Sequence, residues 1–223
     1  MRVLGLDTST TQASIAIVDD DRVLGEATHD VSERRSTDLL VVIDKLCAAH
    51  GIAPGAFDAI AVGAGPGSFT GLRIGMATTK GIGFAAGKPL WAVSSLAALA
   101  FEAKQPAVCA VLDARRGEVF AGCYRDGALV GDERVMAPTG LGTWASSLLT
   151  EPRFVGDALA SYPELAPLAD RWQPATPLGR AVALLALAGP RTDVLTSGAP
   201  MYIRPSEAEI RYPDGVPGAL RKR

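Results

Sequence analysis

Short apolar runs and stretches with helical periodicity alternate along the chain in an order that predicts an α/β fold. In the first half, three strand-like runs are followed by a helix, and then by a strand, a helix, a strand and a helix. The aspartates at 19–21 read as the turn between the second and third runs. The predicted strands are 2–7, 13–18, 22–28, 58–63 and 90–93, and the predicted helices are 36–50, 71–86 and one starting at Ser94 or Ser95.

The second half repeats this order. Residues 107–113 form an apolar run that ends in Asp113, just as the run 2–7 ends in Asp7. Asp126-Gly127, between two strand-like runs, is a strong signal for a two-residue hairpin turn. The other predicted elements are strands at 118–124, 128–135 and 153–156 and helices at 141–149 and 178–188. We therefore expect two similar α/β domains with mixed sheets flanked by helices, residues 1–104 and 105–223, the second ending in a loosely packed tail from residue 200.

Composition and charge narrow the classes of function. The 223 residues are 48% hydrophobic and 21% charged, the balance of an ordinary globular protein. The net charge of −2 provides no overall basic field for nucleic acid or an anionic membrane, and no apolar run approaches the ~20 residues that span a bilayer. No targeting segment is recognised, and Cys47, Cys109 and Cys123 lie in apolar stretches, as reduced core thiols do. These features predict a cytoplasmic protein with no membrane partner.

A glycine-rich segment lies between the strand at 58–63 and the helix at 71–86. It is not a phosphate-binding P-loop, because no Gly-Lys-Ser/Thr follows it. Its glycines permit positive φ angles, its proline stiffens the turn, and Ser68 or Thr70 can cap the helix. The structural loop predicted here consists of Gly65, Pro66, Gly67, Ser68, Thr70 and Gly71.

Each predicted domain opens with a hairpin whose first strand ends in an aspartate. Two domains of this kind are similar to the actin/hexokinase superfamily, a ribonuclease H-like fold whose first hairpin presents small hydroxyl residues to nucleotide phosphates. The corresponding residues here are Asp7, Thr8, Ser9, Thr10, Asp113 and Arg115. Arg115 and Arg116 are long cations where a close phosphate approach needs small residues, although arginine itself can bind phosphate. We therefore interpret both hairpins as vestigial phosphate sites.

The glycine-rich segment carries a narrower resemblance. Residues 65–75 match the signature of the TsaB family nearly residue for residue, and residues 6–9, 112–119 and 200–204 match further family motifs in the expected order. The chain thus resembles the TsaB family over almost its whole length. This resemblance implies a non-catalytic scaffold or activating subunit of the machinery that makes threonylcarbamoyladenosine, the modified adenosine next to the tRNA anticodon.

The same resemblance implies the partners. It implies a heterodimer with the catalytic paralogue TsaD and help in recruiting the ATPase TsaE, with tRNA met only through the complex. It implies no active site and no cofactor in this chain. A homodimer is the alternative assembly.

The residues themselves offer little for catalysis. TsaD places two metal-binding histidines four residues apart on a helix, and the corresponding positions here are Ser95 and Leu99, neither of which can hold a transition metal. The two histidines of the chain, His29 and His50, stand near predicted element ends, where solvated surface groups are common. We therefore expect no catalytic residue and no metal.

Small residues recur every four positions in the predicted helix 71–86, at Gly71, Gly75, Thr79 and Gly83. Because glycine in a helix costs about 1 kcal/mol relative to alanine, such a stripe indicates that another backbone approaches closely. The stripe packs either on the domain's own sheet or on a partner subunit, and the resemblance favours the partner, with helix 36–50 beside it. The predicted partner interface comprises Leu39, Val42, Ile43, Leu46, Arg73, Gly75, Thr79, Ile82 and Gly83.

Two enzymatic functions stay open as alternatives. An independent small-molecule kinase of the same superfamily would need a working second phosphate hairpin and an adenine site, and no Gly-Gly pair occurs late in the chain to receive an adenine. A metallopeptidase-like enzyme would need metal ligands at the positions that Ser95 and Leu99 occupy.

Overall fold

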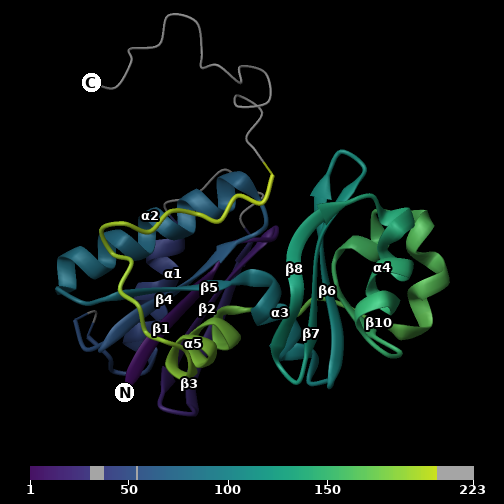
Figure 1. Ribbon diagram of the computed structural model, residues 1–223. Coiled ribbons are helices and arrows are strands. Elements are labelled where there is room, and N and C mark those ends of the chain that lie inside the picture. Colours follow the sequence, from purple (N-terminus) through teal and green to yellow (C-terminus); the bar gives the residue numbers. More distant parts are fainter. Residues whose placement is uncertain (31–37, 54, 205–223) are drawn as a thin grey trace, which may run out of the picture.

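Two five-stranded sheets lie side by side in the computed structural model, which describes residues 1–30, 38–53 and 55–204 (Figure 1). The first sheet has the order β3-β2-β1-β4-β5, and the second has the order β10-β9-β6-β7-β8. In each sheet, the hairpin strands pair antiparallel and the next strands pair parallel, so both sheets are mixed. Helices cover the faces of both, which confirms the predicted α/β class with mixed sheets flanked by helices.

The first sheet and its helices comprise β1 (Arg2–Asp7), β2 (Gln12–Asp19), β3 (Arg22–Asp30), α1 (Asp38–Ala49), β4 (Ala59–Gly65), α2 (Phe69–Ala86), β5 (Leu90–Ser94) and α3 (Ser95–Ala103). The second comprises β6 (Ala107–Arg115), β7 (Glu118–Arg125), β8 (Ala128–Met136), α4 (Leu141–Leu148), β9 (Arg153–Gly156) and β10 (Trp172–Gln173), and α5 (Gly179–Ala188) follows. Short 3-10 helices lie at Pro138–Gly140, Ala158–Ala160 and Pro163–Arg171.

The predicted elements agree with these bounds to within a few residues. The proposed cap Ser36 of the first helix lies outside the described residues. The sequence reasoning did not predict β10 or the 3-10 helix Pro163–Arg171. Two residues are too few to show a strand period, and Pro167 interrupts the 3-10 helix.

One apolar cluster joins the two sheets. It includes Val3 and Ala16 from the first sheet and Val108 and Ala110 from the second, with residues of α3 and α5 between them. The backbone of α5 lies so close to β1 that a Cβ on Gly5 would stand 2.2 Å from the carbonyl oxygen of Gly179. The chain therefore returns to the first sheet after completing the second, and the division at residues 104 and 105 stays a prediction.

Helices α1 and α2 cover the opposite face of the first sheet, over a core that includes Leu4, Leu6 and Ile60. Of the two caps that the sequence offered for α2, Ser68 and Thr70, the structure has Ser68, whose side chain accepts a hydrogen bond from the Gly71 N–H at 3.2 Å. Gly87 caps the other end, with the left-handed φ of 62° common at helix C-termini.

The small-residue stripe of α2 faces the protein's own interior. A Cβ on Gly75 would lie 2.2 Å from the Thr8 hydroxyl oxygen, and one on Gly83 would lie 2.7 Å from a methyl of Leu195. Thr79 is buried, and its hydroxyl donates to the Gly75 carbonyl. Of the two open interpretations, the structure supports packing on the chain's own elements.

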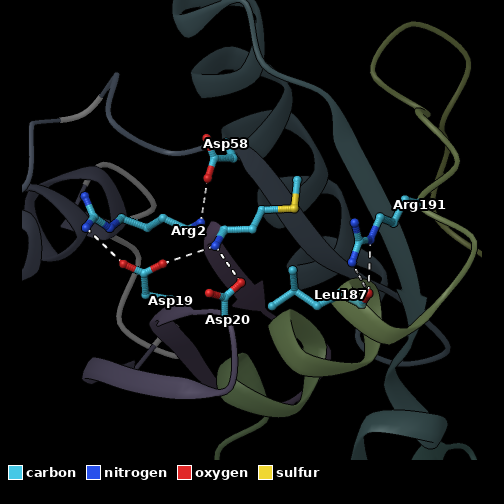
Figure 2. A network of polar contacts seen from close by, with 7 residues as sticks. Arg2, Asp19, Asp20, Asp58, Leu187 and Arg191 are labelled. Carbon is cyan, nitrogen blue, oxygen red and sulfur yellow. Dashed lines mark hydrogen bonds and ion pairs between the residues drawn. The ribbon is translucent and has the colours of Figure 1, made fainter.

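A polar network holds the start of β1, at the end of the strand away from Asp7 (Figure 2). The N-terminal ammonium group lies 2.6 Å from a carboxylate oxygen of Asp20, and the Arg2 guanidinium lies 3.0 Å from Asp19. The Arg2 N–H donates to Asp58, which directly precedes β4. These contacts tie β1 to its neighbours on both sides, so β1 is fixed at this end while its other end carries the candidate site.

Two glycines of α2 provide a matched test of this packing. We expect Gly75→Ala to destabilise the fold by about 1–3 kcal/mol, because the added methyl group overlaps the Thr8 hydroxyl. Gly81→Ala meets no atom within 4 Å and should be neutral or stabilise by up to about 1 kcal/mol. Urea unfolding of both variants measures the difference, and equal stabilities would show that α2 does not lie on Thr8 as described.

Candidate functional site

The sequence motifs converge on one cleft between the two halves of the molecule. The cleft holds a cavity of about 510 Å³. Its walls come from the β1–β2 turn, the glycine-rich loop, the β6–β7 turn and the segment 201–204. The lining residues used below are Ser9, Thr10, Ser68, Phe69, Asp113, Arg115, Arg116, Met201, Tyr202 and Arg204.

Asp7 lies behind the first wall and is fully buried. Its carboxylate accepts hydrogen bonds from the Ser9 N–H at 2.9 Å and from the hydroxyls of Ser9 and Ser95 at 2.6 and 2.7 Å. Gly63 makes room for it, since a Cβ there would lie 1.9 Å from an Asp7 oxygen. Burial raises the pKa of Asp7, although these hydrogen bonds act in the opposite direction. The Asp7 carboxylate is therefore bonded to groups inside the protein and is not exposed in the cleft.

The hydroxyls of Thr8, Ser9 and Thr10 all donate to groups of this chain, and the vestigial phosphate site stays a prediction. The Thr8 hydroxyl is buried and donates to the Gly71 carbonyl at 2.8 Å, inside the first turn of α2. The Ser9 carbonyl accepts from the Ser68 N–H at 2.7 Å. Thr10 lines the cavity, and its hydroxyl donates to the Gln12 carbonyl.

The glycine-rich loop fits tightly between the β1–β2 turn and the segment 201–204. A Cβ on Gly67 would lie 2.5 Å from the Ser9 carbonyl oxygen, and one on Gly65 would lie 2.8 Å from the Met201 carbonyl oxygen. Gly65 also has a φ of 115°, which L side chains rarely adopt. At both positions there is no room for a side chain, and at Gly65 the positive φ also favours glycine.

The second wall is an ion network built on Asp113. The Asp113 carboxylate accepts from the Arg115 N–H at 2.7 Å and from the Tyr162 hydroxyl at 2.6 Å, and it lies 3.1 Å from the Arg115 guanidinium. Burial acts to raise the pKa of Asp113, but these bonds and the charge of Arg115 lower it below its ordinary value. Burial and the neighbouring Asp113 raise the pKa of Tyr162 to about 12.

Two arginines of this wall are held in unusual backbone conformations. Arg115 and Arg116 have φ angles of 61° and 59°, in the left-handed region. The register of the β6–β7 pair shifts between Asp113 and Arg115, and the intervening Ala114 has no partner in the register. Arg115 pairs with Glu118, and its guanidinium lies 3.1 Å from the carboxylate of Asp113 on the same wall.

Both aspartates are engaged by donors of their own chain, Asp7 by Ser9 and Ser95 and Asp113 by Arg115 and Tyr162. The Ser95 hydroxyl is bonded to Asp7, and Leu99 lies in the core between the sheets. Within residues 1–30, 38–53 and 55–204, no group of three or more histidine, cysteine, aspartate or glutamate residues is arranged to hold a metal ion. The absence of a catalytic role and of a cofactor stays a prediction.

The residues predicted for the partner interface lie mostly inside the chain. Those that are buried are Leu39, Ile43, Leu46, Gly75, Thr79 and Gly83. Val42 and Ile82 are partly buried against the same core, while Arg73 is exposed. A buried side chain cannot contact a partner without a rearrangement, so these residues support α1 and α2 from within.

Sequence reasoning missed the apolar side chains that these helices expose. Leu40 and Val41 of α1 are 53% and 49% exposed, and Phe84 of α2 is 59% exposed. The signal was present: Leu40 and Val41 are apolar but lie off the helical face of Leu39, Ile43 and Leu46. These side chains leave apolar area on the outer surface of α1 and α2.

Comparisons with known proteins agree with this architecture. A family model described as TsaD, tRNA N6-adenosine threonylcarbamoyltransferase, matches residues 25–138. A Pseudomonas aeruginosa crystal structure, described as an uncharacterized protein with similarity to peptidase YEAZ, aligns with a TM-score of 0.78 and 30% identity over 91% of this chain and 99% of that one. Component A of (R)-2-hydroxyglutaryl-CoA dehydratase from Acidaminococcus fermentans, at 10% identity, 84% and 98% coverage and a TM-score of 0.54, shares the fold alone.

Three curated relatives carry the name tRNA threonylcarbamoyladenosine biosynthesis protein TsaB, among them one from Bacillus subtilis and one from Haemophilus influenzae. The Bacillus subtilis protein is 32% identical over 69% of this chain and 68% of its own length. The Haemophilus influenzae protein is 39% identical over 54% of this chain, and the match spans about half, 52%, of its own length.

The two mixed sheets, each led by an antiparallel hairpin and flanked by helices, have the actin/hexokinase-like fold that the sequence predicted. Within that class, the glycine-rich signature and the curated relatives determine the family. The chain belongs to the TsaB family. None of the helices among the described residues is both long and apolar enough to cross a bilayer.

The two aspartates should respond to pH with opposite signs. Since the folded-state pKa of Asp7 is raised, ionised Asp7 weakens the fold as pH rises above the unfolded value of about 3.9. Asp7→Asn keeps the shape and can donate to Ser95, so it should be more stable than wild type at pH 7.5, with the advantage vanishing towards pH 4.

Asp113 supplies the control. Because its folded-state pKa is lowered, its ionised form stabilises the fold above the unfolded pKa and loses that effect as pH falls. Asp113→Asn should therefore be less stable than wild type at pH 7.5 and approach it only as pH falls below about 4. Thermal melts of both variants from about pH 2.5 to 8 measure this, and a loss of stability in Asp7→Asn at pH 7.5 would contradict the assignment.

Proposed function

We propose that this chain is a non-catalytic scaffold and activating subunit in the formation of threonylcarbamoyladenosine in tRNA. It pairs with a TsaD-like catalytic paralogue, helps to recruit a TsaE-like ATPase, and meets tRNA only through that complex. Membership of the TsaB family supports the pathway, because the curated relatives carry its name. The match to the TsaD family model supports common ancestry with the catalytic subunit.

The observation that carries the scaffold role is the outward apolar surface of α1 and α2. Leu40, Val41 and Phe84 are large apolar side chains that are about half exposed on two helices whose inner faces are already packed. The outer face of α2 also presents Ala77 and Gly81, which are small and exposed. Apolar anchors beside small residues suit close packing of helices from a second subunit.

The residues of the cleft also support the scaffold role over an independent kinase. An independent kinase would need carboxylates and hydroxyls that are free to face a nucleotide and a metal. Here Asp7 is held by Ser9 and Ser95, and Asp113 is held by Arg115 and Tyr162. The polar groups of the hairpins thus stabilise the chain, and no observation favours the kinase over the scaffold.

Substitutions on the outer surface should separate pairing from folding. We expect Leu40→Glu and Phe84→Glu each to weaken association with the TsaD-like paralogue at least about tenfold, which corresponds to 1.4 kcal/mol. A charge there would be desolvated on binding yet remain hydrated in the free chain. Leu129→Glu, on the similarly exposed Leu129 of β8, is the control and should pair normally.

Titration calorimetry and thermal melts of the same preparations provide the comparison. Unchanged melting temperatures with weakened pairing support the surface. Normal pairing of both α-helix variants would place the interface elsewhere.

The absence of a chemical role can be tested at Asp113. We expect Asp113→Ala to support threonylcarbamoyladenosine formation in a reconstituted system at the wild-type level once it is assembled, because Asp113 bonds only to this chain's own groups among the described contacts. The assay combines tRNA, the donor-forming enzyme, the paralogue and the ATPase, and quantifies the modified nucleoside. A variant that assembles fully yet stops transfer would assign catalysis to this chain.

A further inference from the structure

The segment after α5 runs back across the first half of the molecule and ends at the cleft (Figure 1, yellow). Near its start, the Val194 N–H donates to the Leu90 carbonyl at 2.8 Å, beside β5. Leu195 then packs against Gly83 of α2. The Met201 N–H donates to the Ala64 carbonyl at 2.6 Å, at the end of β4. The path is thus fixed at several points before it reaches the cleft.

At the cleft, Tyr202 joins the first turns of α2. Its ring lies 5.2 Å from that of Phe69, centroid to centroid, and its hydroxyl accepts a hydrogen bond from Arg73 Nε at 3.0 Å. The Arg73 guanidinium also lies 3.8 Å above the Phe69 ring. These three side chains form one exposed cluster on the first half of the molecule.

Two residues further on, the segment contacts the other half. The Arg204 guanidinium lies 3.0 Å from the Glu118 carboxylate, at the start of β7. Glu118 lies on the β6–β7 hairpin, which carries Asp113 and Arg115. Three consecutive residues, 202–204, therefore connect the two walls of the cleft, and all three line the cavity.

We propose that Tyr202–Arg204 is a latch that holds the interdomain cleft closed. The extensive contact between the halves is the apolar core with α3 and α5, which in this proposal stays packed when the cleft opens. The latch bridges the walls of the cleft itself. A partly exposed ion pair and an arginine–aromatic contact are each weak, so releasing one changes the ratio of closed to open molecules by only a few-fold to about tenfold. Contacts of that strength suit a device that opens and closes.

The latch also reaches the surface of α2. Arg73 binds Tyr202 with the same exposed guanidinium that is predicted to meet a partner. A partner that takes Arg73 competes with Tyr202 and so releases Arg204 from Glu118. Through this contact, docking on α2 opens the cleft; this step rests on the proposed function, whereas the latch itself does not.

The latch can be tested in the full isolated chain by measuring the distance between its halves. Spin labels on Asp21→Cys of the β2–β3 turn and Ser146→Cys of α4 report on opening, since both positions are exposed and neither lies on the proposed docking surface. The native cysteines are at most 2% exposed and should stay unlabelled. We expect Tyr202→Ala and Arg204→Glu to lengthen and broaden the distance distribution, and Arg204→Glu with Glu118→Arg to restore it.

Arg191→Ala is the matched control, because Arg191 lies on the same segment but bonds to the Leu187 carbonyl away from the cleft (Figure 2). It should leave the distribution unchanged. Distributions identical to wild type in both Tyr202→Ala and Arg204→Glu, with melts showing folded protein, would overturn the latch. Failure of the charge exchange to restore closure would overturn the role of the Arg204–Glu118 pair.

A second arm tests the coupling. Arg73→Ala should open the cleft of the isolated chain, and adding the TsaD-like paralogue should open the wild-type chain. If the paralogue binds and the distance does not change, the coupling is wrong. If it does not bind at all while the latch variants still open, the proposed function fails and the latch stands.

Discussion

The close approach of α2 to Thr8 is the constraint on which the rest of the structure depends. A Cβ on Gly71 or Gly75 would lie 2.1–2.2 Å from atoms of Thr8, so the first two turns of α2 lie on the end of β1 only because those side chains are absent. The Thr8 hydroxyl then satisfies the Gly71 carbonyl. With α2 fixed there, Phe69 and Arg73 face outward at the cleft, where Tyr202 reaches them.

The same packing accounts for the state of the first hairpin. Once α2 and the glycine-rich loop lie against residues 8 and 9, no open space separates the hairpin backbone from the loop, and Asp7 is sealed behind them. A buried carboxylate without a cation needs full hydrogen bonding, and Ser9 and Ser95 supply it. In the paralogue TsaD, the resemblance implies a metal ligand at the position that Ser95 occupies here. In this chain Ser95 instead donates a hydrogen bond to Asp7.

Local signals in the sequence were sufficient for most of the fold. The Asp126-Gly127 turn has both φ angles positive, and Ser68 caps α2, as their residue types predict. Contacts between distant segments were not predictable in this way, because a pair such as Arg73 and Tyr202 leaves no trace in the periodicity of either segment. The stripe of α2 was ambiguous for a related reason: small residues permit close packing whichever backbone approaches.

The helix α1 shows why the candidate surface could not be chosen from periodicity alone. Residues that recur at helical spacing, such as Leu39, Ile43 and Leu46, form the face that the chain buries when it folds, so they are covered in the free chain. A surface for a second subunit must be formed by apolar residues of the helix that lie outside this buried face. Leu40 and Val41 are such residues, and in a free chain they stay in water. An apolar side chain off the buried stripe of a helix is therefore a better sign of a docking surface than one within it.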